Sequence, residues 1–223
     1  MSPSDLGSDP RRVATYDFDE ASHYLHVPIS TIRAWACGEN GVEPLITAAG
    51  DRSPVLSFIN LVEIHMLTGI SLVHEVRTQN VHAALHDKRN YYGPHPLASR
   101  VLLTEDIDLF ARNLGEVGNH FGPPKQDLID VISAYRKRIE WEDNEPVVLF
   151  PFPTANALDG RKSVMIDPRI SFGRLVISGT GIVTEIVVER FRAGESIDDL
   201  AKDYRRDRLE IEDVLRVEPP LAA

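Results

Sequence analysis

The chain has 223 residues, of which 43% are hydrophobic and 26% are charged, as in an ordinary globular protein. Its net charge of −10 excludes the broadly basic field with which most nucleic-acid-binding proteins neutralise phosphates. Any DNA contact therefore has to be local, doubled by dimerisation or helped by a basic partner. A net charge of −10 is equally consistent with a protein whose acidic surface only keeps it in solution.

Three features of the sequence predict a cytoplasmic protein. No apolar run approaches the roughly 18 to 20 residues that span a membrane. The first residues, MSPSDLGSDPRR, lack the apolar segment of a secretory signal, and we expect residues 1–13 to be a disordered lead-in. The single cysteine, Cys37, cannot form an internal disulfide, which fits a reducing compartment.

The first predicted elements are two short helices joined by a tight turn. Asp19 is a candidate N-cap for a helix that runs to about Leu25. Pro28 breaks the chain, and a second helix is expected over residues 30–37, where Gly38 ends it. Two short helices in this arrangement form a helix-turn-helix.

The second helix of this pair is the candidate DNA-recognition helix. Such a helix needs short polar and basic side chains on its first turn, which faces base edges and phosphates. A hairpin formed by residues 44–47 and 54–58 is expected to follow as a wing. The side chains predicted to contact DNA are Ser30, Thr31, Arg33 and, at the hairpin tip, Arg52. The alternative is a solvated helix in a structural bundle.

From residue 60 the sequence predicts a helical and hairpin extension. The expected elements are a helix from Asn60 to Gly69, a helix from Ser71 to about residue 88, a hairpin of 101–103 with 107–110, a helix over 126–139 and a strand over 147–150. A Pro- and Gly-bearing connector comes next. We therefore predict a domain over 14–153, a linker over 154–163 and a second domain over 164–218.

The last third of the chain predicts a second helix-turn-helix. Short strands over 164–166 and 175–177 precede three helices, which begin at Thr184, after the N-cap Ser196 and at Arg208. The last helix carries three carboxylates, those of Glu210, Glu212 and Asp213. Because phosphates would repel them, we expect this unit to bind protein or to dimerise, although nearby arginines leave a contact with the DNA backbone open.

No residue pattern predicts catalysis, a cofactor or a metal. The glycine-rich stretch 173–181 lacks the lysine and the spacing of a phosphate-binding loop. His82 and His86 stand four apart on a predicted helix, but no third ligand is evident. No pair of carboxylates is marked as an acid and base couple by apolar surroundings. We predict that the protein is not an enzyme, and a hydrolase using these histidines is the least favoured alternative.

Two stretches resemble known families. Residues 20–35, EASHYLHVPISTIRAW, resemble the helix-turn-helix of MerR-like winged-helix regulators. Residues 166–182 (IDPRISFGRLVISGTGI) and 193–204 (AGESIDDLAKDY) resemble a small domain of unknown function that recurs in VapB-type antitoxins, the partners of PIN-domain ribonuclease toxins. Leu175 stands where that domain usually has proline, and Gly181 where it often has arginine.

Both units in one chain resemble the longer VapB-like antitoxins. The resemblance implies an autorepressor that binds operator DNA as a homodimer and neutralises a PIN-domain toxin that cuts RNA. The expected fold is α+β: a MerR-like winged helix-turn-helix with a helical and hairpin extension, then a C-terminal helix-turn-helix preceded by a short β-hairpin. Two alternatives stay open, namely a protein-interaction scaffold that does not bind DNA and a transcription regulator without a toxin.

Overall fold

The computed structural model describes residues 9–39, 41–52, 55–73, 78–116, 125–152 and 160–218. The helices are α1 (Phe18–Leu25), α2 (Ile29–Cys37), α3 (Phe58–Leu72), α4 (Thr78–Tyr92), α5 (Ile107–Glu116), α6 (Lys125–Arg136), α7 (Thr184–Arg192), α8 (Ile197–Tyr204) and α9 (Arg208–Val217), with short 3-10 turns η1 (Pro96–Ala98) and η2 (Ser171–Gly173). The strands are β1 (Ile139–Glu142), β2 (Glu145–Leu149), β3 (Val164–Met165) and β4 (Val176–Ile177).

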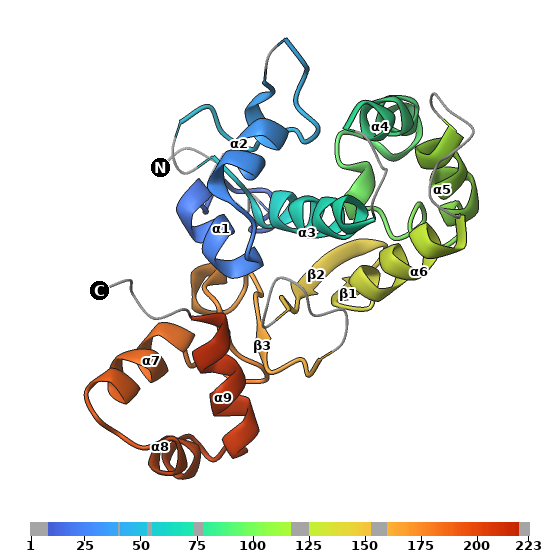
Figure 1. Cartoon of the computed structure of the whole chain (residues 1–223). Helices are drawn as coiled ribbons and strands as arrows, with labels where there is room; N and C mark the ends of the chain where they lie inside the picture. The colour runs from blue at the N-terminus through green and yellow to red at the C-terminus, as the bar shows by residue number, and fades with distance from the viewer. Residues whose placement is uncertain are drawn as a thin grey trace.

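These elements confirm the predicted α+β class, because helices surround two small antiparallel sheets, β1–β2 and β3–β4. Figure 1 shows α3 in the middle of the molecule, with α1 and α2 at one end and α4 to α6 at the other. The helices α7 to α9 form a separate group on the side of β3 (Figure 1).

The central helix α3 is apolar on nearly every side and is therefore buried. Ser57 caps its first turn, where the Ser57 hydroxyl accepts the amide of Asn60. Gly69 lies inside this helix, so the predicted interruption there is wrong. A Cβ on Gly69 would lie 2.7 Å from ring atoms of Tyr135 on α6. Glycine is needed at this position because α3 and α6 approach each other so closely.

The predicted wing hairpin is wrong for the described residues. The amides of residues 45–46 donate to the carbonyl of Trp35 at 2.8 and 3.1 Å, whereas Leu56 forms an isolated bridge with Tyr16. The first run therefore bonds to α2, and the second bonds to the N-terminal segment and, through the carbonyl of Val55, to the amides of residues 49–50. Residues 44–47 form no ladder with the described residues of the second run. Residues 53–54 of the predicted hairpin lie outside the described part of the chain.

The second predicted hairpin is also wrong. Residues 101–105 form turns, and α5 begins at Ile107. Phe110 and Leu114 are fully buried four residues apart, as on one face of a helix. The run of residues 107–110, with three apolar residues and Asp108, is too short for its period to separate a strand from a helix, and the longer pattern decides.

Helix boundaries in the middle of the chain differ from the prediction. α3 continues through Ser71, whose hydroxyl donates to a carbonyl of the same helix at 2.8 Å instead of capping a new one. α4 begins at Thr78, and residues 74–77 lie outside the described residues. α6 ends at Arg136, before the predicted end at residue 139. Ile139 instead begins the strand β1, which was not predicted.

The sheet β1–β2 confirms the strand predicted near 147–150 and adds its partner. Ile139 pairs with Leu149, and a two-residue turn joins the strands. Asp143 and Asn144 in this turn have φ values of 46° and 69°, as a type I′ hairpin requires. An isolated bridge between Leu149 and Ile166 connects this sheet to β3.

The C-terminal unit contains the predicted elements. β3 pairs with β4, α7 begins at Thr184, and the hydroxyl of Ser196 accepts the amide of Asp199 at 3.1 Å as the cap of α8. One cluster of buried side chains extends from Tyr16 to Val217 and so includes residues of both predicted domains. Most of the predicted linker lies outside the described residues, and its position stays a prediction.

Candidate nucleic-acid interface

The helix pair α1–α2 is held by local capping. Asp17, not Asp19, caps α1: its Oδ1 accepts the amide of Glu20 at 2.8 Å, and Glu20 Oε2 accepts the amide of Asp17 at 3.0 Å. His26 ends α1 in the left-handed conformation, with φ 54°. Pro28 then stands at the N-cap of α2, which has no side-chain cap. This geometry fixes the tight turn that a helix-turn-helix needs.

The helix α2 turns one face to the core and the opposite face to solvent. Ile32 and Trp35 are buried. Ser30 and Arg33 are exposed on the other side. The Cζ atom of Arg33 lies 5.0 Å from the centre of the Phe18 ring, which holds the guanidinium along α1. The exposed face thus presents a hydroxyl and a cation close together.

The other two residues predicted to contact DNA are Thr31 and Arg52, and only Thr31 lies on α2. Thr31 is half-buried and, with Ser30, lines a hollow of about 580 Å³ beside α2. Glu39 and Glu43 line the same hollow and would repel a phosphate. Arg52 is exposed and does not line this hollow. The structure therefore brings three of the predicted residues together on α2 and leaves Arg52 on a separate loop.

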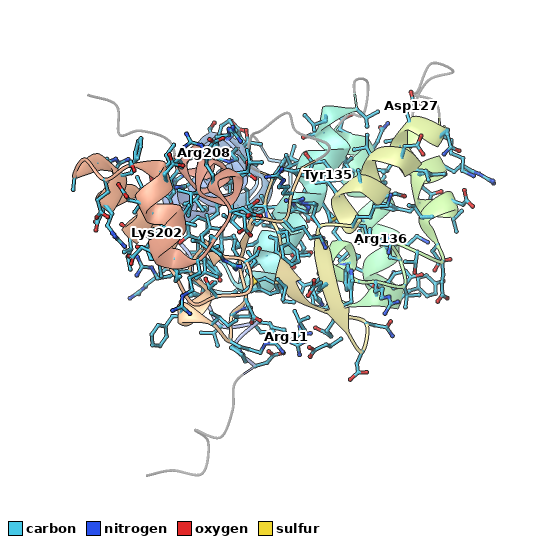
Figure 2. All side chains as sticks on the ribbon, turned by 90° about the horizontal axis from the view of Figure 1, so that it is seen from below. Arg11, Asp127, Tyr135, Arg136, Lys202 and Arg208 are labelled. Carbon is cyan, nitrogen blue, oxygen red and sulfur yellow. The ribbon has the colours of Figure 1, made fainter. Side chains whose placement is uncertain are left out.

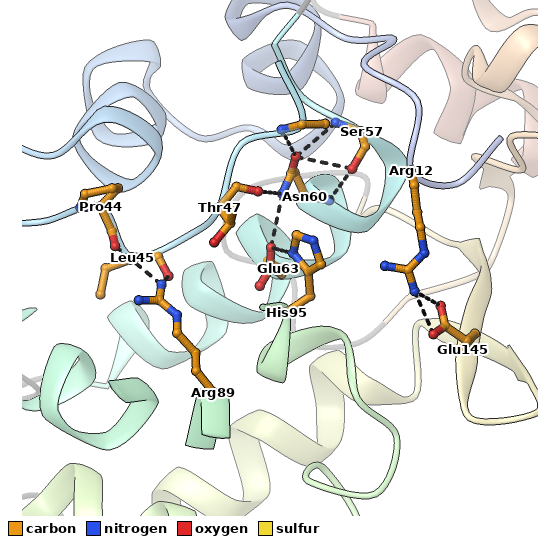
Figure 3. Close-up of polar contacts among 11 residues, drawn as sticks. Arg12, Pro44, Leu45, Thr47, Ser57, Asn60, Glu63, Arg89, His95 and Glu145 are labelled. Atoms are coloured by element: carbon orange, nitrogen blue, oxygen red, sulfur yellow. Dashed lines mark hydrogen bonds and ion pairs between the residues drawn. The ribbon is translucent and has the colours of Figure 1, made fainter. Parts of the chain in front are cut away.

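A buried polar network links α3 to the segment that follows α2 (Figure 3). Asn60 Nδ2 donates to the carbonyl of Thr47 at 2.8 Å and to Glu63 Oε2 at 3.1 Å. His95 Nδ1 lies 2.9 Å from the same Glu63 oxygen. Burial raises the pKa of Glu63, and the contact with His95 partly opposes that shift. No local sequence pattern predicts this network, because its members come from three separate segments.

Arg89 on α4 adds a further hydrogen bond to the segment that follows α2. One of its guanidinium nitrogens donates to the carbonyl of Leu45 at 2.7 Å (Figure 3), and the amide of the same residue donates to the carbonyl of Trp35. The middle helices therefore fix the chain where it leaves α2. A contact face on α2 is more useful for recognition when its neighbouring segment is rigid.

The helix pair also contacts the C-terminal unit. His23 Nε2 lies 2.8 Å from Glu218 Oε2, and the Thr184 hydroxyl donates to Glu218 Oε1 at 2.7 Å. The Tyr16 hydroxyl donates to the carbonyl of Gly173 at 2.9 Å. The Glu218 carboxylate raises the pKa of His23. Burial works against the charged form of Glu218, but bonds from His23 and Thr184 lower its pKa.

In the C-terminal helices, arginines pair with carboxylates of the same unit. Arg208 lies 2.5 Å from Asp198 and 3.0 Å from Glu212, measured between nitrogen and oxygen. Arg216 lies 2.6 Å from Asp213 and also contacts Glu212. These cations are already compensated, so they have less to gain from a phosphate. The arrangement favours a protein-binding role for this unit.

His82 lines the hollow beside α2, and burial lowers its pKa. The described residues contain no group of three His, Cys, Asp or Glu side chains placed to bind a metal. In the same residues, no helix has the length and apolarity to cross a membrane.

Comparisons with known proteins cover both units. Residues 164–217, from β3 to α9, match the family described as "Protein of unknown function (DUF433)". A protein of Mycobacterium tuberculosis (strain ATCC 25618 / H37Rv) named "Putative antitoxin VapB45" is 27% identical over 86% of this chain and 88% of its own length. The chain resembles a VapB-like antitoxin. The crystal structure of Rv2018 from Mycobacterium tuberculosis matches with a TM-score of 0.73 at 26% identity, over 91% of this chain and 98% of that one.

The VapB-like resemblance extends beyond the C-terminal family. The relative covers 86% of the chain and the crystal structure 91%, so both matches extend well beyond residues 164–217. The likeness of α1–α2 to MerR-type regulators stays a prediction. The predicted DNA contacts through Ser30, Thr31, Arg33 and Arg52 stay predictions as well.

Proposed function

We propose that the chain is the antitoxin of a type II toxin–antitoxin system, binding operator DNA as an autorepressor and neutralising a PIN-domain ribonuclease toxin. The observation that carries this proposal is the exposed Ser30–Arg33 face of α2, in a chain that resembles VapB45 over 86% of its length. A toxin partner follows from the name of that relative, and the PIN class follows from the resemblance of residues 166–204.

The DNA half of the proposal places α2 in the major groove. Ser30 and Arg33 would meet base edges or phosphates, with Thr31 at the margin of the same turn. Arg52 would reach the DNA backbone or the minor groove from its loop. Because the net charge is −10 and Glu39 and Glu43 flank α2, one copy of the chain attracts DNA phosphates only weakly at this face. A homodimer would double the contacts, with recognition helices about 34–36 Å apart.

The toxin half of the proposal uses the C-terminal unit. Its arginines are bound to its own carboxylates, as described for Arg208 and Arg216, which suits a protein interface better than a phosphate backbone. An acidic chain also attracts a basic partner and accelerates their encounter.

The DNA half is tested by fluorescence anisotropy with the DNA upstream of the chain's own gene, at two salt concentrations. Arg33→Ala should bind at least about tenfold more weakly, because a base or phosphate contact is lost in each copy of the dimer. Arg112→Ala removes the same charge from the exposed surface of α5 and should bind as the wild type does. Equal binding of Arg33→Ala and wild type would show that α2 is not the recognition helix.

A second candidate function is a protein-interaction scaffold that does not bind DNA. The observation that favours it is the pair of carboxylates, Glu39 and Glu43, beside the candidate recognition face. Sequence-specific binding that weakens steeply with salt would exclude this scaffold, because only a DNA-bound protein releases condensed counterions. A regulator without a toxin would bind the operator but leave the ribonuclease active.

A further inference from the structure

The C-terminal unit displays an aromatic ring that the fold does not bury. Phe172 is 90% exposed, more than any other exposed large hydrophobic residue in the described chain. Its φ of 58° lies in the left-handed region, as do those of Ser171 at 48° and Gly173 at 76°. A bulky side chain in this region is strained, and strain of this kind is concentrated at functional sites. Strain and exposed apolar surface thus coincide at one residue.

The turn that carries Phe172 is fixed by hydrogen bonds on both sides. The buried hydroxyl of Tyr16 donates to the carbonyl of Gly173 at 2.9 Å. The hydroxyl of Ser171 donates to the carbonyl of Gly181 at 3.0 Å, and the amide of Gly173 donates to Ile170 at 2.9 Å. The ring is therefore held outward before any partner arrives, which lowers the entropy cost of binding.

Charged side chains near the turn disfavour a nucleic acid as the partner. Arg169 lies 2.9 Å from Asp167 and 3.3 Å from Glu142, and Arg174 pairs with Glu185. Each cation next to Phe172 is thus compensated within the chain. A nucleic acid would find carboxylates beside every arginine of this turn, whereas a protein pocket can accept the ring itself.

The surface beside the turn is suited to a basic protein. A hollow of about 300 Å³ begins at Pro168 and Arg169 and extends to the β1–β2 hairpin and to Arg11. Its carboxylates are those of Asp9, Glu142, Asp143 and Glu145. Arginines pair with Asp9, Glu142 and Glu145, whereas Asp143 is exposed and forms no ion pair with the described residues. Figure 2 shows Arg11 at the edge of the molecule near this hairpin. The carboxylate of Asp143 and the net charge of −10 attract a basic partner and repel a second copy of the chain.

We propose that Phe172 is the anchor by which the C-terminal unit binds the toxin. The ring enters an apolar pocket of that basic protein, and the acidic hollow beside Arg169 faces its basic side chains. The inference rests on the proposed antitoxin function and adds the surface that performs it.

The test uses the full chain and a candidate PIN-domain toxin expressed from the reading frame next to its gene, with affinity measured by isothermal titration calorimetry. Phe172→Gly removes the ring and relieves the left-handed strain, so the variant should be at least as heat-stable as the wild type and bind at least about tenfold more weakly. Tyr91→Ala removes another ring, 82% exposed on α4, and should leave the affinity unchanged.

A charge variant tests the hollow separately. Asp143 has a positive φ that asparagine tolerates, so Asp143→Asn removes one charge with little backbone cost. It should bind about threefold more weakly at low salt and like the wild type at high salt.

The outcomes separate the inference from the proposed function. If the wild type binds the PIN-domain protein and Phe172→Gly binds within twofold of it, the anchor is refuted and the antitoxin function stands. If the wild type does not bind, the proposed toxin partner fails and the anchor fails with it. If Phe172→Gly changes the sedimentation of the chain measured alone, this surface is an interface between two copies of the chain. If Phe172→Gly is less heat-stable than the wild type, Phe172 has a structural role. Either result would overturn the proposal.

Discussion

The hydrogen bond from Tyr16 to Gly173 joins residues 157 apart in the sequence and connects the helix pair to the C-terminal unit. Tyr16→Phe removes the hydroxyl and keeps the ring. A buried hydrogen bond contributes about 1 kcal/mol, and the carbonyl left without a partner costs about 1–3 kcal/mol. Tyr16 is 2% exposed, so water cannot easily replace the lost donor. We expect the free energy of unfolding to fall by about 1–3 kcal/mol.

Gly173→Ala tests the same contact from the other side. A Cβ there would lie 2.2 Å from the Tyr16 hydroxyl oxygen and 3.2 Å from the ring carbon that bears it, at a φ of +76°. The left-handed conformation costs alanine about 1–2 kcal/mol, and the clash adds about 1–3 kcal/mol. Tyr16→Phe removes the atom at 2.2 Å. The double variant should therefore be at least about 1 kcal/mol more stable than the sum of the single effects predicts.

Urea unfolding followed by circular dichroism and tryptophan fluorescence gives the four free energies of this cycle. Tyr91→Phe, on the 82% exposed ring, is the control and should change stability by less than about 0.5 kcal/mol. For a chain of this length, each kcal/mol corresponds to a shift in Tm of about 2–4 °C. Additive effects of Tyr16→Phe and Gly173→Ala, or a Tyr16→Phe variant as stable as the wild type, would refute the reasoning.

Two further predictions concern packing and pH. Gly69→Ala should lower the free energy of unfolding by about 1–3 kcal/mol, because its Cβ would lie 2.7 Å from the Tyr135 ring, while Gly181→Ala, with its nearest atom at 3.7 Å, should be close to neutral in the same urea titration. Because the pKa of His23 is raised in the folded protein, its contribution to the free energy of unfolding is complete below its unfolded value of pH 6.5. This contribution is lost as the pH rises through the folded pKa. The lowered pKa of Glu218 means that its contribution is complete above pH 4.5 and is lost as the pH falls through the folded pKa. The loss in free energy of unfolding caused by His23→Gln should thus be largest between these two pH values and small at about pH 9. An equal loss in both pH ranges would exclude the ion pair.

The sequence predicts most of what depends on neighbours along the chain. The second helix of the pair, the start of the helix predicted from residue 126 and the cap at Ser196 all follow local rules, and the structure contains them. Local patterns fail where a run is short, as in residues 107–110, which belong to α5 and not to a strand.

The remaining features depend on contacts between distant segments. Gly69 looks like a helix breaker until the ring of Tyr135 is placed against it. The hydrogen bond from Tyr16 to Gly173 and the strained turn at Phe172 leave no periodic or compositional signal, because they arise only when the two units pack together. The candidate face on α2 could be predicted from its residue types, whereas the carboxylates beside it could not.

The most direct test of the antitoxin account takes the protein encoded next to this chain's gene and measures whether it cleaves RNA, and how that cleavage changes as the chain is titrated into the reaction. The account predicts that cleavage falls in proportion to added chain and stops near a fixed stoichiometry. Cleavage that continues unchanged at a large excess of the chain would contradict it.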